Sequence, residues 1–122
     1  LEPLNTRIDH PGMFLNNTRL ALDIIEAVDS PRLQLLFDVY HSMVMEEEME
    51  EVLGGRMHRV GHVQIAQAPD RNEPDPRSGE WPNVIARLQR LGYNGAIGLE
   101  YKPSLPAAAS VARAREATGL SC

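Results

Sequence analysis

The segment Gly95-Ala-Ile-Gly-Leu-Glu-Tyr-Lys-Pro103 is typical of a short buried strand that ends in a charged side chain. Ile97 and Leu99 are apolar, and two glycines permit close packing. Glu100 follows Leu99 directly, with no polar residue between the apolar run and the charge. Interior strands of a parallel sheet are apolar runs, and their C-terminal ends open onto the site. The carboxylate of Glu100 is therefore a candidate functional group.

Other segments repeat this pattern along the chain. Residues 33–38 form an apolar run that ends in Asp38, and residues 60–66 form one that carries Gln64. At its start the sequence has an apolar residue followed directly by Glu2, which we interpret as the end of a further strand. These strand ends recur at intervals typical of successive βα units.

Helices are expected between and after the strands, in residues 20–28, 43–53, 82–91 and 107–117. Asn and Thr side chains suited to an N-cap precede the first, Pro82 lies in the first turn of the third, and Gly119 ends the last. Alternation of strands and helices predicts an α/β fold with a parallel sheet and right-handed crossovers. We expect one domain over residues 1–122, with a long polar loop at 67–81.

The overall composition excludes several classes of protein. The net charge of -5 disfavours binding to a nucleic-acid backbone or an anionic membrane. No apolar run approaches the roughly 20 residues of a membrane span. The single cysteine, Cys122, forms no disulfide within the chain, which is typical of a reducing compartment. We expect a cytoplasmic protein that binds neither nucleic acid nor membrane.

Side-chain alternation places the polar groups of these strands on one face. Gly98 and Glu100 share a face of their strand, as His62 and Gln64 do on theirs. If that face lines a barrel, one mouth gathers four polar groups: Glu2, Asp38, Gln64 and Glu100. Three carboxylates there repel unless protons or a cation neutralise them, and oxygen ligands suit Mg²⁺, Mn²⁺ or Ca²⁺. The alternative is that basic side chains pair with these groups and no metal binds.

Five motifs in the same order resemble the hydroxypyruvate isomerase family, which belongs to the xylose-isomerase-like TIM barrels. The motifs are Glu2-Pro-Leu-Asn5, Phe37-Asp-Val-Tyr-His41, Gly61-His-Val-Gln-Ile-Ala66, Pro69-Asp-Arg-Asn-Glu-Pro74 and Gly98-Leu-Glu-Tyr-Lys-Pro103. The resemblance fades between residues 43 and 60 and beyond residue 104.

The resemblance implies about half of a TIM barrel, strands five to eight, because the complete fold has eight strands and typically about 250 residues. Half a barrel leaves two edge strands unpaired and the inner face uncovered. We therefore expect this chain to lack an N-terminal half, or to pair with a second half or a second copy of itself.

The resemblance also implies a chemistry. A divalent metal, Mg²⁺ or Mn²⁺, would be held by Glu2, Asp38, Gln64 and Glu100. Glu2 and Glu100 would also be the acid/base pair that moves a proton between neighbouring carbons through an enediol. The family reaction is an aldose–ketose isomerisation that interconverts hydroxypyruvate and tartronate semialdehyde, so the expected substrate is a small hydroxy-oxo acid.

Three further residues are candidates for substrate binding. His41 resembles a family histidine beside the metal-binding Asp, although a histidine tied to a loop carbonyl is an alternative. The guanidinium of Arg71 suits a substrate carboxylate, unless it is an exposed loop residue. Lys102 extends in the same direction as Glu100. Glu73 is expected to order the loop, and His10 is expected at the surface, as is His58.

Other functions remain open at this point. One is an isomerase or epimerase of another sugar or sugar acid, such as a 2-oxo-tetronate. Another is a catalytically inactive half-barrel that serves as a binding or scaffold domain. A DNA-repair endonuclease shares the barrel type, but the acidic charge balance argues against it.

Overall fold

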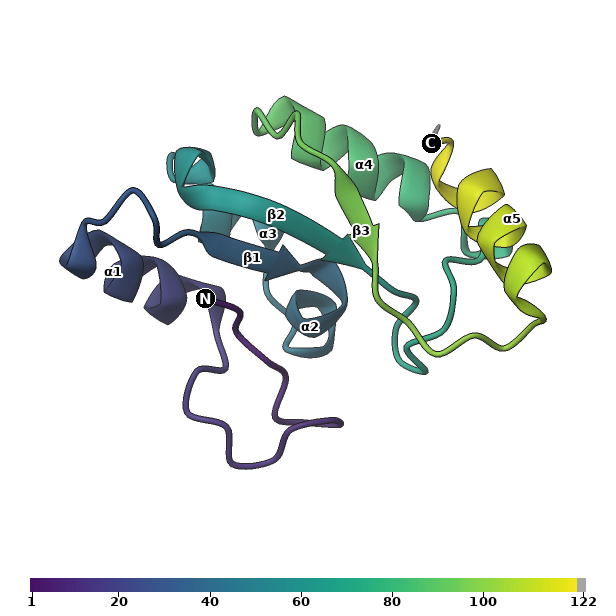
Figure 1. Cartoon of the computed structure of the whole chain (residues 1–122), viewed down its shortest axis with the longest axis horizontal. Coiled ribbons are helices and arrows are strands. Elements are labelled where there is room, and N and C mark those ends of the chain that lie inside the picture. The colour runs from purple at the N-terminus through teal and green to yellow at the C-terminus, as the bar shows by residue number, and fades with distance from the viewer. Residues whose placement is uncertain (121–122) are drawn as a thin grey trace.

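The structure, a computed structural model, describes residues 1–120, so the expectation drawn from Cys122 lies outside the described residues. Within that range the chain forms a parallel sheet in the order β1-β2-β3, with β1 at Leu35–Asp38, β2 at Val60–Ile65 and β3 at Ile97–Leu99 (Figure 1). The predicted α/β fold with parallel βα units is confirmed. It is the arrangement that part of a TIM barrel would have.

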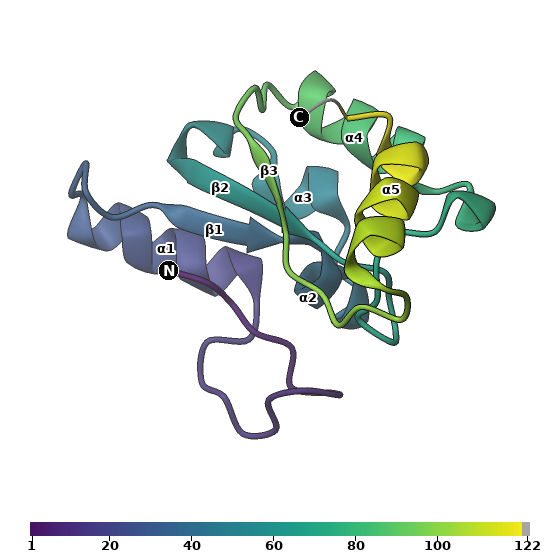
Figure 2. The same ribbon diagram turned by 45° about the vertical axis from the view of Figure 1, so that its right-hand side comes forward.

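Within residues 1–120 five α-helices accompany the sheet: α1 (Thr18–Val28), α2 (Val39–Val44), α3 (Met49–Leu53), α4 (Trp81–Arg90) and α5 (Ala107–Thr118). The Asn17 side chain caps α1 by accepting the backbone N–H of Leu20, and Gly119 ends α5 in the left-handed conformation. These are the residue types preferred at helix ends. Figure 2 shows α4 and α5 side by side next to β3. In the described part of the chain, no helix is long and apolar enough to cross a membrane.

The single helix expected over residues 43–53 was wrong. A helix begins directly after β1, because Asp38 Oδ1 accepts the backbone N–H of Tyr40 at 2.9 Å and so caps α2. Glu46 then takes a left-handed conformation, with φ of 60°, and separates α2 from α3. The break frees the next residue, Glu47, to accept the backbone N–H and the hydroxyl of Thr18, at 2.7 and 2.6 Å.

The loop expected at residues 67–81 is more ordered than its sequence suggested. Gln67 and Asn72 form an isolated antiparallel bridge, and Pro76–Ser78 form a turn of 3₁₀ helix. The indole N–H of Trp81, which is fully buried at the start of α4, donates to Gln67 Oε1 at 2.8 Å. These contacts tie the loop to both elements that it connects.

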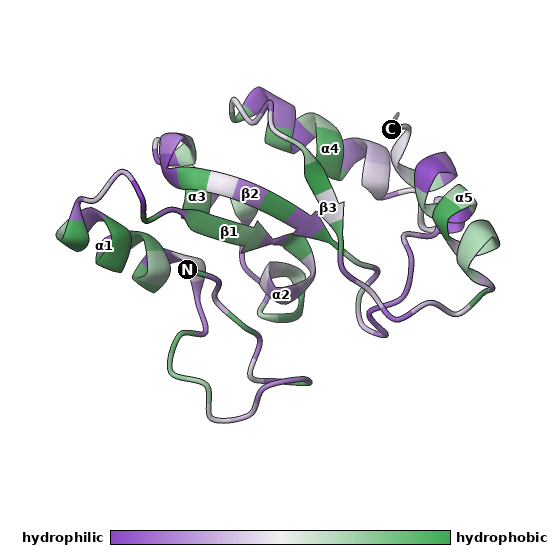
Figure 3. Cartoon of the chain, viewed as in Figure 1, coloured by the Kyte–Doolittle hydropathy of each residue, from purple (hydrophilic) through white to green (hydrophobic). Residues whose placement is uncertain are grey.

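The hydrophobic core lies between one face of the sheet and the helices. Phe37, Val63 and Ile65 point into it and are almost fully buried together with residues of α1, α3 and α4. Figure 3 shows β1 as mainly hydrophobic, whereas hydrophobic and hydrophilic residues alternate along β2 and α4. Because side chains alternate along a strand, the opposite face carries Asp38 and Gln64, which are register partners on neighbouring strands.

Leu1 makes backbone hydrogen bonds at β1 as a residue of a neighbouring strand would, although no strand is assigned there. The N-terminal amine of Leu1 donates to the carbonyl of Gln34, and the backbone N–H of Leu36 donates to the carbonyl of Leu1, both at 2.8 Å. Glu2 is thereby placed beside the C-terminal half of β1. The interpretation of Glu2 as a strand-end residue holds in position, if not in assigned structure.

Candidate active site at the strand ends

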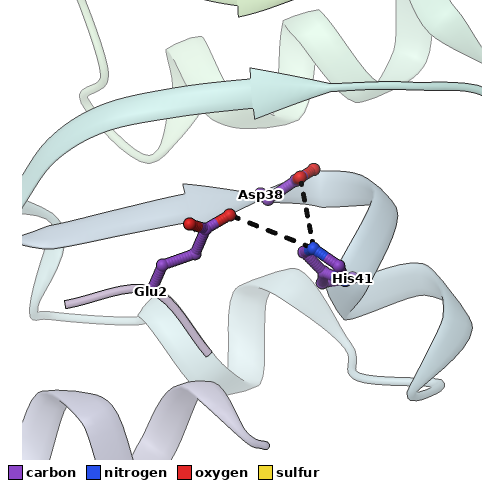
Figure 4. Close-up of side chains that lie close together, drawn as sticks. All are labelled: Glu2, Asp38 and His41. Carbon is purple, nitrogen blue, oxygen red and sulfur yellow. Dashed lines mark ion pairs between the residues drawn. The ribbon is translucent and has the colours of Figure 1, made fainter. Parts of the chain in front are cut away.

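Glu2, Asp38 and His41 converge in one place at the C-terminal end of β1. Each offers a ligand atom, and these atoms lie within 4.8 Å of one another. Figure 4 shows the three side chains directed toward a common space from the N-terminal segment, the end of β1 and α2. His41 Nε2 lies 3.7 Å from Asp38 Oδ2 and 4.0 Å from Glu2 Oε1. We call the set of Glu2, Asp38, Gln64 and Glu100 the carboxylate rim.

Gln64 and Glu100 complete the rim from the neighbouring strands. The register pairs Gln64 with Asp38 on β1 and with Gly98 on β3, and Glu100 follows β3 directly. A Cβ on Gly98 would lie 2.7 Å from His62 Nε2 and 3.2 Å from Gln64 Cγ, so glycine makes room for both side chains. The register therefore places Gln64 and Glu100 at the same edge of the sheet as Asp38, but Glu100 does not belong to the close group of Glu2, Asp38 and His41.

The negative charges of the rim carboxylates repel one another, which disfavours their ionised forms. Burial, together with the charges of Glu2 and Glu100, raises the pKa of Asp38 to about 7 against the opposing effects of the Tyr40 backbone N–H and of Arg71. Burial also raises the pKa of Glu2, with Glu100 as the next cause. Burial lowers the pKa of His41 to about 4, assisted by the positive charge of Arg71. The rim thus favours a bound cation, which would offset the repulsion.

The donor set fits a hard divalent cation. Asp38 Oδ2 and Gln64 Oε1 are buried, and neither has a hydrogen-bond partner within residues 1–120. Unpaired buried acceptors are rare because they cost free energy, and two neighbouring ones in a carboxylate cluster are groups that a cation could satisfy. With Glu2 and Glu100 the set is all oxygen, as Mg²⁺ and Mn²⁺ prefer.

Arg71 is the cation that the structure itself places at the rim. Its Nη2 lies 3.3 Å from Glu100 Oε2 and 4.0 Å from Asp38 Oδ2, and its guanidinium carbon lies 5.0 Å from the centre of the Tyr40 ring. Only 14% of its side chain is exposed, so the alternative of an exposed loop arginine was wrong. Arg71 neutralises part of the rim but leaves Asp38 Oδ2 without a hydrogen bond.

The loop that carries Arg71 is fastened to the segment after β3. The backbone N–H of Lys102 donates to the carbonyl of Arg71 at 2.7 Å. The carboxylate of Glu73, which is almost fully buried, accepts the backbone N–H and the hydroxyl of Ser104 at 2.9 and 2.7 Å. These hydrogen bonds hold the pKa of Glu73 down, at about 2. The expectation that Glu73 orders the loop is confirmed.

Lys102 extends past the rim rather than into it. Its side chain is 73% exposed, and Nζ lies 3.9 Å from Asp9 Oδ1. The role of Lys102 in substrate binding stays a prediction.

His10, expected at the surface, is partly exposed and lies beside His41. Its side chain is half-buried, and its ring centre lies 5.6 Å from that of His41. The loop after Glu2 folds back on itself through the backbone N–H of His10, which donates to the carbonyl of Asn5 at 3.1 Å. His58, by contrast, is exposed as expected.

Three further residues of the site were missed from the sequence. Asn5 is fully buried, and its side chain and backbone both contact His41 Nδ1. The hydroxyl of Tyr40 donates to Asp9 Oδ2 at 2.5 Å. Asn5 lay inside a motif used for the resemblance, but nothing in its pattern showed that its amide reaches His41.

Comparison with protein families finds one family model that matches almost all of the described residues. A family model described as "Xylose isomerase-like TIM barrel" matches residues 1–118. Among solved structures, one described as an AP endonuclease of family 2 from Brucella melitensis superimposes with a TM-score of 0.81. It is 33% identical, and the match covers 91% of this chain and 43% of that one.

Curated relatives carry the names of isomerases. A putative hydroxypyruvate isomerase from Xenopus laevis is 42% identical over 104 residues, which is 84% of this chain and 38% of the relative. A 2-oxo-tetronate isomerase from Cupriavidus necator is 39% identical over 103 residues, which is 84% of this chain and 39% of the relative. The chain thus spans about two fifths of the length of the curated relatives that it matches.

Proposed function

This chain belongs to the xylose isomerase-like TIM barrel family, and from that premise we propose that the protein is an aldose–ketose isomerase of a small hydroxy-oxo acid. The proposed reaction interconverts hydroxypyruvate and tartronate semialdehyde. The observation that carries the proposal is the carboxylate rim, with two unpaired buried oxygens, on Asp38 and Gln64. The isomerase relatives support the reaction class.

The reaction moves one proton between adjacent carbons and needs no outside oxidant. The hydroxymethyl carbon of hydroxypyruvate loses a proton, the electron pair of that C–H bond forms the C=C bond of the enediol, and the former carbonyl oxygen takes up a proton. A proton then returns to the former carbonyl carbon while the hydroxyl on the other carbon loses its proton and becomes the aldehyde oxygen. Glu2 and Glu100 lie on different elements of the rim and serve as the group that takes the proton and the group that returns it.

Glu2, Asp38, Gln64 and Glu100 are the residues that would hold Mg²⁺ or Mn²⁺. When bound, the ion would polarise the carbonyl and hydroxyl oxygens of the substrate. The raised pKa of Asp38 indicates that the rim gives up protons as it gains the cation.

Substrate recognition is proposed for the basic groups around the rim. The guanidinium of Arg71 presents a planar set of donors that matches a carboxylate, and its backbone is fastened to Lys102. His41 directs Nε2 toward the same space. Lys102 adds positive charge at the exposed margin.

A second candidate is the isomerisation of a 2-oxo-tetronate, a longer hydroxy-oxo acid. It is favoured by the similar identity to the relative that carries this name, 39% against 42%. The chemistry at the rim would be the same, and residues outside this chain would contribute to the choice of substrate. The net charge of -5 disfavours a DNA substrate, although one structural neighbour is described as an AP endonuclease.

The proposal is tested with the full-length protein, Mn²⁺ and each of the two hydroxy-oxo acids. We expect isomerisation of hydroxypyruvate, followed by ¹H NMR, to stop on addition of a chelator and to return with excess Mn²⁺. Glu100→Gln should remove turnover, whereas Glu116→Gln, the same change at an exposed position of α5, should not. Turnover of neither acid would exclude the proposed reaction, and faster turnover of 2-oxo-tetronate would favour the second candidate.

A further inference from the structure

We infer that Asn5 is a positioning residue that fixes the tautomer of His41, so that the ring proton is on Nε2 and His41 faces the rim as a hydrogen-bond donor. The inference rests on the proposed function for its catalytic meaning, but the tautomer itself is a property of the protein. The inference also implies that His41 is not a metal ligand, although Nε2 of His41 lies close to Glu2 and Asp38.

The orientation of the Asn5 amide is determined by its four neighbours. Asn5 Oδ1 accepts the backbone N–H groups of Ile8 and Asp9, both at 3.0 Å. Asn5 Nδ2 lies 2.8 Å from Asp9 Oδ2 and 2.7 Å from His41 Nδ1. An amide has two acceptor sites on oxygen and two N–H groups, and all four are used here. Exchanging oxygen and nitrogen would set an N–H group against two backbone donors.

The tautomer of His41 follows from the donors on Nδ1. The backbone N–H of Asn5 donates to His41 Nδ1 at 3.1 Å, and a backbone N–H has no other role. The Nδ2 group of the same residue is the second donor. Nδ1 therefore offers its lone pair and carries no proton. In a neutral imidazole the proton is then on Nε2.

The Nε2–H group points at the site of the chemistry. Two acceptors face it, Asp38 Oδ2 at 3.7 Å and Glu2 Oε1 at 4.0 Å. Arg71 Nη2, which can only donate, lies 3.4 Å from the same nitrogen, but Nδ1 has two donors and both are closer, at 3.1 and 2.7 Å. Because Nε2 bears a proton, it has no lone pair for a metal ion. It is instead suited to donate to a substrate oxygen on which negative charge develops as the enediol forms.

A second layer of contacts holds Asn5 in place. Asp9, which accepts from Asn5, also accepts the hydroxyl of Tyr40 at 2.5 Å. The ring of Tyr40 packs beside His41, with ring centres 5.2 Å apart. Burial raises the pKa of Asp9, but the hydrogen bonds from Tyr40 and Asn5 outweigh it and lower the pKa overall. Asp9 thus remains a charged acceptor that directs the Asn5 amide toward His41.

The first experiment reads the tautomer directly. Long-range ¹H–¹⁵N correlation spectra of the full-length protein labelled at histidine report which ring nitrogen is protonated, and His41→Gln assigns the signal. We expect an unprotonated Nδ1 and a protonated Nε2 near neutral pH, with no metal added. A protonated Nδ1 in the wild-type protein would overturn the inference, whether or not the protein is an isomerase.

The second experiment changes what Asn5 offers to the ring. In the double variant Asn5→Asp/Asp9→Asn, an oxygen replaces the donor at His41 Nδ1, while the pair between positions 5 and 9 is kept with its roles reversed. We expect protonation to shift toward Nδ1 and kcat to fall by about 10- to 100-fold with a smaller change in KM, the size seen when outer contacts of a site are lost. Asp9→Asn alone keeps the amide at Asn5 and should keep the wild-type tautomer.

The outcomes separate this inference from the proposed function. A wild-type tautomer spectrum in the double variant, with a folded protein by circular dichroism, would show that the side chain of Asn5 does not set the tautomer and that the backbone N–H of residue 5 is sufficient. The expected spectra without turnover of either acid would keep the inference about His41 and reject the proposed reaction.

Discussion

Asp38 combines three tasks in one side chain. It ends β1, it caps α2 through Oδ1, and it leaves Oδ2 buried at the rim without a hydrogen bond in the described chain. A strand-end carboxylate was predictable from the sequence because an apolar run stops at it. The cap was not, because the sequence does not show that a helix starts at the next residue.

Asp38 should make the stability of the metal-free protein depend on pH. Its pKa is about 7 in the folded protein against an ordinary value of 3.8, so it favours folding below pH 3.8 and loses that contribution as the pH rises through 7. The change is of the order of 4 kcal/mol. His41, with a lowered pKa, acts in the opposite direction between pH 4 and 6.5. The comparison with Asp38→Asn isolates the first effect, because asparagine keeps the cap.

Urea unfolding of both proteins from pH 4 to 7 measures the difference. The free energy of unfolding of the wild type, relative to Asp38→Asn, should decrease steadily with pH, and saturating Mn²⁺ should reverse the trend. If the difference in free energy of unfolding is independent of pH, the pKa of Asp38 is not raised in the folded protein.

Arg71 should compete with a metal ion for the rim. Its guanidinium lies 3.3 Å from Glu100 and 4.0 Å from Asp38, where it would repel a divalent cation. Arg71→Gln should therefore raise Mn²⁺ affinity at least about tenfold and raise KM for a substrate carboxylate. Arg71→Lys keeps the charge and should leave Mn²⁺ affinity near that of the wild type. Equal affinities in Arg71→Gln and the wild type, by calorimetry, would exclude the competition.

The acidic run between α2 and α3 shows how elements depend on one another. In this run Glu48 and Glu50 pair with Arg87 of α4. The prediction that this run lies on a single helix was wrong, because Glu47 accepts hydrogen bonds from Thr18 at the start of α1. That contact joins residues far apart in the chain, and helical periodicity carries no information about it.

Removing the Glu47 contact should destabilise the fold. Glu47→Ala leaves the backbone N–H and hydroxyl of Thr18, which is almost fully buried, without their acceptor. We expect a loss of about 2 kcal/mol in the free energy of unfolding by urea. Glu46→Ala, which breaks only an exposed pair with Arg7, should cost less than about 1 kcal/mol. Equal losses in the two variants would show that the Thr18 contact does not contribute.

Gly98 should link the packing of β3 to the metal site. A Cβ there would contact the ring of His62 and approach Gln64 Cγ at 3.2 Å. Gly98→Ala should cost about 1–3 kcal/mol of stability and weaken Mn²⁺ binding by displacing Gln64. The added change His62→Ala should recover part of the metal affinity, because it removes the nearer contact. Wild-type stability and affinity in Gly98→Ala would contradict this account of the strand.

At the scale of the molecule, local patterns predicted the order of elements well. Apolar runs, cap residues and turn glycines gave the three strands and the helices α1, α4 and α5 close to their observed bounds. They also predicted that Asp38, Gln64 and Glu100 lie at the C-terminal ends of neighbouring strands; that these three and Glu2 hold one metal ion stays a prediction. The contacts of Asn5 and His10 could not be predicted from the sequence, because the path of the loop after Glu2 depends on the fold that surrounds it.

This chain spans about two fifths of the length of its curated relatives. A cavity of about 520 Å³ lies between β3, α4 and α5, and its apolar lining includes Leu88, Ile97 and Ala114. It shares no residue with the rim. The expectation that another half-barrel or a second copy covers the inner face stays a prediction.

Calorimetric titration of the metal-free full-length protein with Mn²⁺ tests the central claim most directly. We expect one site per chain, loss of binding in Asp38→Asn and Glu100→Gln, and wild-type binding in the control Glu116→Gln. Affinity should increase with pH up to about 7, as Asp38 gives up its proton. Binding that is unchanged in Asp38→Asn and Glu100→Gln, or absent from the wild type, would contradict the assignment of the carboxylate rim as a metal site.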